Sequence, residues 1–134
     1  MNIENEKRLK DKVAIVTGGG RGIGRAIVFD FAREGANVVA CGRTPAPLEE
    51  VSQEARRAGY SVLAIKADVS VEHEVESMVE ETIKKFGKID ILVNNAAIVG
   101  PVGLITDISK EAWDEVLNVN LGGTFLCSKA VLKP

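Results

Sequence analysis

The sequence has few of the residues from which proteins build metal centres and disulfide frameworks. It contains two cysteines and one histidine, and Cys41 and Cys127 each lie in an apolar pattern typical of a small buried side chain. These counts argue against a disulfide framework and against a protein-built metal site. His73 stands among glutamates and is interpreted as a solvated surface residue, so no metal ligand is assigned.

Long apolar runs and an excess of one charge are also missing. No stretch approaches the roughly 20 apolar residues needed to cross a bilayer, and residues 1–12 carry charges of both signs, unlike a secretion signal. The formal net charge is −2 and no run of lysine or arginine stands out, which argues against nucleic acid and membranes as partners. We therefore expect a single globular domain located in the cytoplasm.

What the sequence does have is a glycine-rich bend, Gly18–Gly24, between the apolar run Val13–Val16 and an amphipathic segment. This pattern predicts a buried strand, a tight turn and a helix N-terminus. The free N–H groups and the dipole of such a helix end favour a phosphate. A turn that binds nothing is compatible with the same glycines.

The spacing of the glycines separates several nucleotide-binding motifs. The pattern G-x-G-x-x-G does not fit, because its third glycine would fall on a non-glycine residue in either register. The pattern G-x-x-x-G-x-G does fit, on Gly18, Gly22 and Gly24, with Thr17 before it. A P-loop is excluded, since no Gly-Lys-Ser/Thr follows.

Apolar strands alternate with helical patterns along the chain. The predicted strands are Val13–Val16, Asn37–Cys41, Ser61–Ala67 and Ile89–Val93. The alternation of these strands with helices predicts an α/β fold, with a parallel sheet covered by helices on both faces. The glycine turn then lies at the carboxyl ends of the strands. Residues 1–11 are expected to form a polar lead, and residues 12–134 one dinucleotide-binding half-domain.

Helical spacing also predicts which helix faces are buried. Ser70 and Ser109 are predicted N-caps of two of the helices. The predicted core-facing residues are Ile23, Ala26, Ile27 and Phe31 after the glycine turn, and Trp113, Val116 and Leu117 in a later helix.

From about Lys12 to its end, the sequence resembles the short-chain dehydrogenase/reductase family, and most of all its 3-oxoacyl-carrier-protein reductase and polyol or sugar dehydrogenase members. Four motifs occur in the family's order. They are Thr17-Gly18-x-x-x-Gly22-x-Gly24, Asp68-Val69 after the third strand, Asn94-Asn95-Ala96 after the fourth, and Asn120 within Trp113-Asp114-x-x-x-x-x-Asn120.

The resemblance implies a Rossmann-type, doubly wound parallel sheet of strand order 3-2-1-4. It also implies an oxidoreductase that transfers hydride between nicotinamide C4 and a carbonyl or alcohol carbon of a small molecule. It implies a catalytic role for Asn120, and family members are commonly dimers or tetramers, so a homo-oligomer is expected. The implied cofactor-binding residues are Thr17, Gly18, Gly20, Arg21, Gly22, Ile23, Gly24, Arg43, Asp68, Val69, Asn95, Ala96 and Ala97.

Each of these assignments has a structural alternative. Asp68 is also compatible with capping the turn that follows it, and Asn94 and Asn95 with ordinary turn positions. Asn120 is also compatible with a helix kink held by backbone hydrogen bonds. Ala97 replaces the glycine of the family's Asn-Asn-Ala-Gly, which places a methyl group where the backbone lies close to the ligand.

The end of the second strand favours NADP over NAD. Enzymes that prefer NAD present an acidic residue there, to accept from the ribose 2′-hydroxyl. Here the end of the strand reads Cys41-Gly42-Arg43-Thr44, and the next acidic residue is Glu49. Arg43, with Arg21 in the glycine turn, is suited to bind a 2′-phosphate. The alternative cofactor is NAD, with both arginines simply solvated.

The proton-transfer residues of the family are missing from these 134 residues. The family uses a serine and a Tyr-x-x-x-Lys pair, but the one tyrosine is Tyr60, with Ala64 four positions later. We expect a chain truncated before strands five to seven and catalytically incompetent alone, which self-associates along the apolar fourth strand. The alternatives are a non-catalytic NADP-binding module and an inert fragment.

Overall fold

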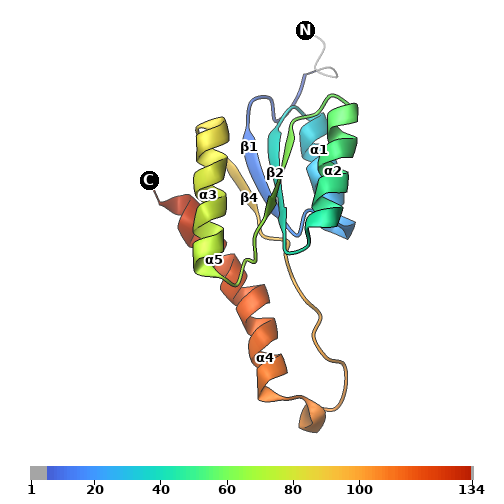
Figure 1. The fold of residues 1–134 in the computed structure, drawn as a ribbon, viewed down its shortest axis with the longest axis vertical. Helices are drawn as coiled ribbons and strands as arrows, with labels where there is room; N and C mark the ends of the chain where they lie inside the picture. The colour runs from blue at the N-terminus through green and yellow to red at the C-terminus, as the bar shows by residue number, and fades with distance from the viewer. Residues whose placement is uncertain (1–5, 134) are drawn as a thin grey trace.

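Four short parallel strands form one sheet in the order β3-β2-β1-β4. This is the arrangement in the computed structural model, which describes residues 6–133 (Figure 1). The predicted strand order 3-2-1-4 is confirmed. The strands are β1 Val13–Thr17, β2 Asn37–Gly42, β3 Val62–Lys66 and β4 Ile91–Val93.

Alternate side chains of the central strands feed two separate cores, because successive residues of a strand point to opposite faces of the sheet. Ile15 and Val39 pack into one core, and Val16 and Val38 into the other. All five residues of β1 are buried, since β1 lies between two strands and under helices on both faces. The continuous apolar run in the sequence has this origin.

The helices cover both faces of the sheet, as predicted (Figure 1). α1 (Gly22–Arg33) and α2 (Pro45–Arg57) pack on one face. α3 (Glu72–Phe86) and α5 (Gly123–Leu132) pack on the other. Both cysteines are buried in this second core, and burial raises the pKa of Cys41 to about 12 and that of Cys127 to about 11, so both stay neutral thiols.

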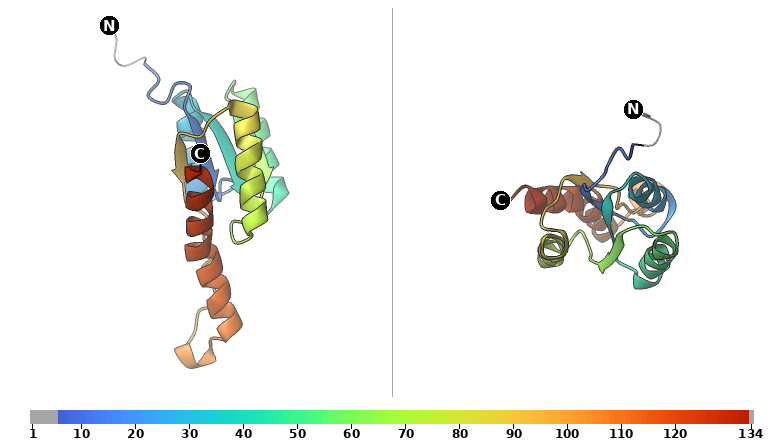
Figure 2. Two further views of the ribbon diagram at one scale, coloured as in Figure 1. Left: turned by 90° about the vertical axis from the view of Figure 1, so that its left-hand side faces the viewer. Right: turned by 90° about the horizontal axis from the view of Figure 1, so that it is seen from above.

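One long helical run leaves the body of the molecule. A 3₁₀ turn (η2, Ile105–Asp107) precedes α4 (Lys110–Leu117), and a π-helical turn (η3, Asn118–Gly122) joins α4 to α5. Figures 1 and 2 show α4 extending past the sheet, while α5 lies against it. Only the second half of this run therefore has the sheet as a packing partner.

The predicted buried face of α1 is right only in part, and that of α4 is wrong. In α1, Ile27 and Phe31 pack against the core as predicted, but the fully buried residues are Gly24, Val28 and Ala32, and Ile23 is 75% exposed. The face is set by the close approach of Gly24 to the turn before the helix, which apolar spacing does not reveal. Trp113 is 55% exposed, because α4 lies beyond the sheet and buries none of its residues.

Local signals at the helix ends give mixed results. Ser109 caps α4, since its Oγ accepts from the amide of Ala112 at 3.1 Å. Ser70 does not cap α3, whose N-cap is Val71. Instead the amide and the hydroxyl of Ser70 both donate to Asp68 Oδ1, at 2.9 and 2.7 Å, and the helix begins one residue too late for Ser70 to be its N-cap.

The described part of the predicted polar lead is attached to the end of α1. The Leu9 amide donates to the Glu34 carbonyl, and Lys7 Nζ to the Arg33 carbonyl, at 2.9 and 2.7 Å. The backbone amide and the guanidinium of Arg8 both contact the Glu34 carboxylate and lower its pKa. The carbonyl groups that α1 leaves free at its C-terminus thereby gain partners.

Candidate functional site

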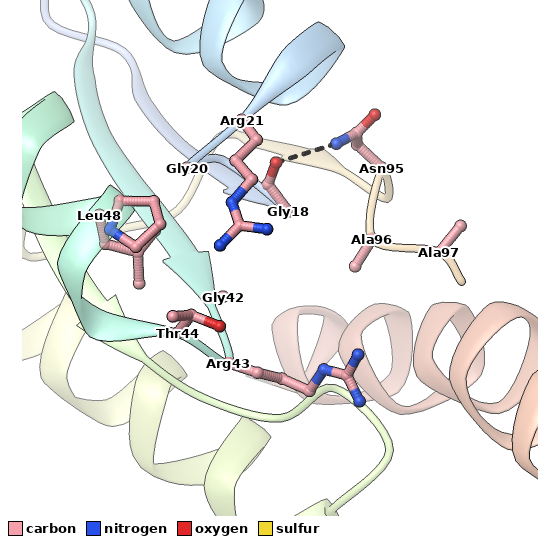
Figure 3. A pocket seen from close by; sticks show the side chains of 11 residues that line it. Gly18, Gly20, Arg21, Gly42, Arg43, Thr44, Leu48, Asn95, Ala96 and Ala97 are labelled. Carbon is pink, nitrogen blue, oxygen red and sulfur yellow. Dashed lines mark hydrogen bonds between the residues drawn. The ribbon is translucent and has the colours of Figure 1, made fainter. Parts of the chain in front are cut away.

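The carboxyl ends of β1, β2 and β4 meet at one edge of the sheet, where a pocket of about 300 Å³ opens (Figure 3). The glycine turn after β1 forms one wall, and the residues after β4 form another. The end of β2 and the start of α2 complete it. The lining includes Gly18, Arg21, Arg43, Thr44, Asn95 and Ala96.

The glycine turn has a backbone that few other residues could adopt. Gly18 and Gly22 have φ values of +64° and +52°, a region costly for side chains with a Cβ. Gly24 has an ordinary helical place, but a Cβ there would overlap the Gly18 carbonyl oxygen and lie 2.5 Å from Asn95 Nδ2. Two glycines thus permit the turn, and the third permits close packing beneath it.

The N-terminus of α1 opens at this turn. Arg21 is its N-cap residue, and among residues 6–133 no side chain caps the first N–H groups of the helix. Uncapped N–H groups at a helix start carry partial positive charge and lack a protein partner. They are therefore suited to an anionic ligand at the mouth of the pocket.

The hydroxyl of Thr17 connects the end of β1 to the chain leaving β4. Thr17 is 1% exposed; its Oγ1 donates to the Val93 carbonyl at 3.3 Å. The same oxygen accepts from the amides of Asn95 and Ala96, at 3.0 and 2.9 Å. Both walls of the pocket are held together by this one side chain.

Asn95 adds a second connection across the pocket floor. Its Nδ2 donates to the carbonyls of Thr17 and Gly18 at 3.1 and 3.2 Å, the latter drawn in Figure 3. The neighbouring Asn94 donates instead to Ser128 Oγ on α5, at 3.2 Å. Asn95 therefore shapes the glycine turn, and Asn94 fixes the nearby helix.

Two arginines, Arg21 and Arg43, reach the pocket. The guanidinium of Arg21 points into the pocket, and the side chain of Arg43 runs along its rim toward the C-terminal helical run (Figure 3). Within residues 6–133 neither guanidinium has a side-chain hydrogen bond or an ion pair. Both guanidinium groups are therefore available to pair with an anionic ligand.

A smaller cavity of about 120 Å³ adjoins the pocket beyond Arg43. Its walls are mostly apolar, and they include Ala67, Val69, Ile98 and Val119. It also borders Ala97, whose methyl group takes the place of the family's glycine hydrogen. A flat, largely apolar group is the kind of ligand that such walls accept.

Asp68 lies before this cavity but is not among its lining residues. Partial burial disfavours its ionised form, yet the two hydrogen bonds from Ser70, helped by the charges of Arg43 and Lys66, outweigh burial and keep the pKa of Asp68 below its usual value. One carboxylate oxygen thus accepts both hydrogen bonds from Ser70. This is the geometry expected if Asp68 caps the turn that follows it, the alternative to cofactor binding. The second oxygen has no partner among the described residues.

Asn120 is held by the backbone of one other residue. Its Oδ1 accepts from the Ile98 amide at 2.8 Å, and its Nδ2 donates to the Ile98 carbonyl at 2.9 Å. These two bonds are what the alternative role of Asn120, a helix kink held by backbone hydrogen bonds, predicts. The helix is irregular at this point, since Asn120 lies in the π-helical turn. A catalytic role for Asn120 stays a prediction.

The start of α2 was missed by sequence reasoning. Thr44, Pro47 and Leu48 line the pocket, and Pro47 packs against Gly20, where an added Cβ would lie 3.1 Å away. The sequence did contain a signal for these residues, because in a parallel sheet the residues after every strand reach the same edge.

In the part of the chain that the structure describes, no three His, Cys, Asp or Glu side chains gather as metal ligands. No helix of residues 6–133 has the length and apolar character to cross a membrane.

Comparisons with known proteins agree with this geometry. The family model described as short chain dehydrogenase matches residues 12–134. Short chain dehydrogenase/reductase dpmpG of Macrophomina phaseolina is 39% identical over 126 residues, which cover 93% of this chain and 72% of that protein. An uncharacterized oxidoreductase of Thermotoga maritima is 41% identical over 121 residues, covering 90% of this chain and 47% of its own.

Solved structures give the same result. A 3-ketoacyl-ACP reductase from Sinorhizobium meliloti superposes with a TM-score of 0.87 at 43% identity, over 90% of this chain and 47% of that one. The citronellol catabolism dehydrogenase AtuB of Pseudomonas aeruginosa gives a TM-score of 0.88 at 36% identity, over 96% and 52%. The chain spans about half the length of these two structures.

Proposed function

Because this chain belongs to the short-chain dehydrogenase family, we propose that residues 12–134 are the dinucleotide-binding part of an NAD(P)-dependent oxidoreductase. The observation that carries the proposal is the open pocket between the glycine turn and the residues after β4. It lies where the strand order reverses, since β2 and β4 flank β1 on opposite sides. Parallel α/β sheets bind ligands at such a point.

The residues present fit a dinucleotide diphosphate. The uncapped start of α1 offers N–H donors, and glycine turns the chain where a Cβ would obstruct it. Thr17 and Asn95 hold the turn, and Ile23, exposed beside it, offers an apolar contact to the nicotinamide end. The bound nicotinamide supplies the hydride acceptor or donor; these residues bind and orient it.

Arg21 and Arg43 support a preference for NADP. A 2′-phosphate would pair with guanidinium groups that form no ion pair within residues 6–133, and charge-assisted hydrogen bonds of this kind are among the stronger ones. No acidic side chain lines the pocket to repel the phosphate. The 2′-hydroxyl of NAD, by contrast, would find no carboxylate to accept from it.

We expect Arg43→Ala to weaken NADP binding by about tenfold to a hundredfold, the loss of one charge-assisted contact, and to leave NAD binding nearly unchanged. Both dissociation constants should be measured by calorimetry on the full chain. Arg57→Ala, at the exposed end of α2, is the matched control. Tighter binding of NAD than NADP by the unmodified chain, or unchanged NADP affinity in Arg43→Ala, would contradict the preference.

Hydride transfer itself belongs, in this proposal, to a longer protein. The one tyrosine, Tyr60, precedes β3 and lies at the amino edge of the sheet, across from the pocket. It is therefore not placed to exchange a proton with a substrate there. We propose that the 134 residues bind the cofactor without turnover, and that the substrate of the whole protein is a small carbonyl compound or alcohol.

A non-catalytic NADP-binding module is the second candidate, favoured by the same unpaired arginines. This candidate makes the same prediction for NADP binding as the first. The two differ in the catalytic residues: an oxidoreductase requires that the gene also encode a serine and a Tyr-x-x-x-Lys, and a binding module does not. An inert fragment would bind no dinucleotide at all. The cytoplasmic location remains a prediction.

We further propose that the protein is a homo-oligomer, and we expect the 134-residue polypeptide to self-associate. β4 pairs with β1 on one side and with no other strand of residues 6–133, and an apolar strand edge is a template for pairing. Leu121 and Phe125 on the helical run are 68% and 60% exposed. Sedimentation velocity over a wide concentration range checks this; a monomer throughout would count against it.

A further inference from the structure

Gly123 is the point where α5 meets the chain leaving β3. It is buried, and a Cβ built on it would lie 2.5 Å from Val69 Cγ2 and 3.1 Å from Val69 Cβ. Real Cβ atoms do not approach other carbons so closely. Only glycine therefore lets the helix touch Val69 as it does, and a methyl group at position 123 would have to displace Val69.

Val69 in turn forms a wall of the smaller cavity of about 120 Å³. It is 5% exposed, and its branched side chain has few rotamers to escape into. Because the same side chain borders Gly123 and the cavity, a displacement of Val69 forced from position 123 changes the shape of this wall. The approach of α5 to Val69 therefore sets the position of this wall of the cavity.

Another part of the cavity lining is held by the same helical run. Ile98 is hydrogen-bonded through both its backbone groups to Asn120, and Val119 itself lines the cavity. Asn120 and Val119 belong to the π-helical turn that immediately precedes Gly123. A single stretch, residues 119–123, therefore contributes Val119 to the cavity lining and contacts two further lining residues, Val69 and Ile98.

We propose that Gly123 is a positioning residue: by letting α5 approach Val69, it sets the width of this cavity to fit the flat adenine ring of the dinucleotide. The inference rests on the proposed function and adds a residue to it that touches no part of the ligand. The apolar walls suit the ring faces, and the planar guanidinium of Arg43 at the rim is able to stack on an aromatic ring.

The test compares two neighbouring glycines of the same helix. At Gly122 an added Cβ would meet only the Leu117 carbonyl oxygen, at an ordinary 3.7 Å. Gly122→Ala and Gly123→Ala make the same chemical change with a similar gain in helix propensity, but only the second contacts Val69. Each full-length variant is titrated with NADP and with etheno-NADP, whose adenine carries an additional fused ring.

We expect Gly122→Ala to leave both affinities unchanged. Gly123→Ala should weaken NADP binding by about tenfold, as expected for modest overpacking, and should weaken etheno-NADP binding by a larger factor. Val69→Ala, which widens the cavity, should shift the ratio of the two affinities in favour of etheno-NADP. This variant also carries the test if circular dichroism shows that Gly123→Ala does not fold.

Two results would overturn the inference. One is equal behaviour of Gly123→Ala and Gly122→Ala. The other is an unchanged ratio of the two affinities in both Gly123→Ala and Val69→Ala, since a residue that only packs the helix would affect both ligands alike. Failure of the proposed function looks different: the unmodified chain would then bind neither nucleotide, which would overturn both proposals.

Discussion

Gly24→Ala is expected to abolish dinucleotide binding and to destabilise the fold by about 3 kcal/mol or more, at the upper end of overpacking substitutions. The added methyl group would overlap the Gly18 carbonyl oxygen and lie 2.5 Å from Asn95 Nδ2. The first of these is a backbone atom of the glycine turn, so relief requires α1 to move away from the turn. That movement would displace the N–H groups proposed to hold the diphosphate.

Gly22→Ala is the matched control for this substitution. Gly22 lies two residues earlier, and a Cβ there would have no atom within 4 Å. Its cost is the positive φ alone, roughly 1–2 kcal/mol. Denaturant unfolding gives the stability of each variant, and nucleotide titration gives the affinity. Equal stabilities for the two variants would contradict the packing argument.

Thr17→Val is expected to lower the free energy of unfolding by about 3 kcal/mol, because one nearly isosteric change leaves buried groups without hydrogen bonds. The hydroxyl donates to the Val93 carbonyl and accepts from the amides of Asn95 and Ala96. With these bonds lost, the segment after β4 is free to move from the glycine turn, and nucleotide affinity should fall with stability.

Thr17→Ser separates the hydroxyl from the rest of the side chain. It keeps the three hydrogen bonds and removes one methyl group, at a cost of about 1 kcal/mol. Chemical denaturation and calorimetric titration of both variants provide the comparison. If valine is tolerated as well as serine, the hydroxyl does not hold the two walls together.

The fold could be predicted because its signals are local. Apolar runs such as Val13–Val16 and Asn37–Cys41 mark strands, and helical segments between them force parallel crossovers of one hand. The parallel sheet and the place of the glycine turn follow from these features, whereas the strand order 3-2-1-4 came from the family resemblance. The ends of the strands were less well defined: β4 is three residues long, Ile91–Val93, rather than the five predicted.

The site could be predicted only in part, because side-chain partners depend on chain segments far apart. Apolar spacing wrongly predicted Trp113 to face the core, because such spacing carries no information on whether the sheet extends beneath α4. The pairing of Asn120 with Ile98 spans 22 residues, and the contact of Gly123 with Val69 spans more. Neither has a local sequence signal, so the cavity that they shape was not foreseen.

The central claim is that a dinucleotide diphosphate rests on the backbone amides at the start of α1. The most direct test is nuclear magnetic resonance of the isotopically labelled chain during titration with NADP. The account predicts the largest amide shifts at residues 18–24, with further shifts at residues 95–97 across the pocket. Shifts centred elsewhere on the molecule, or none at saturating nucleotide, would contradict it.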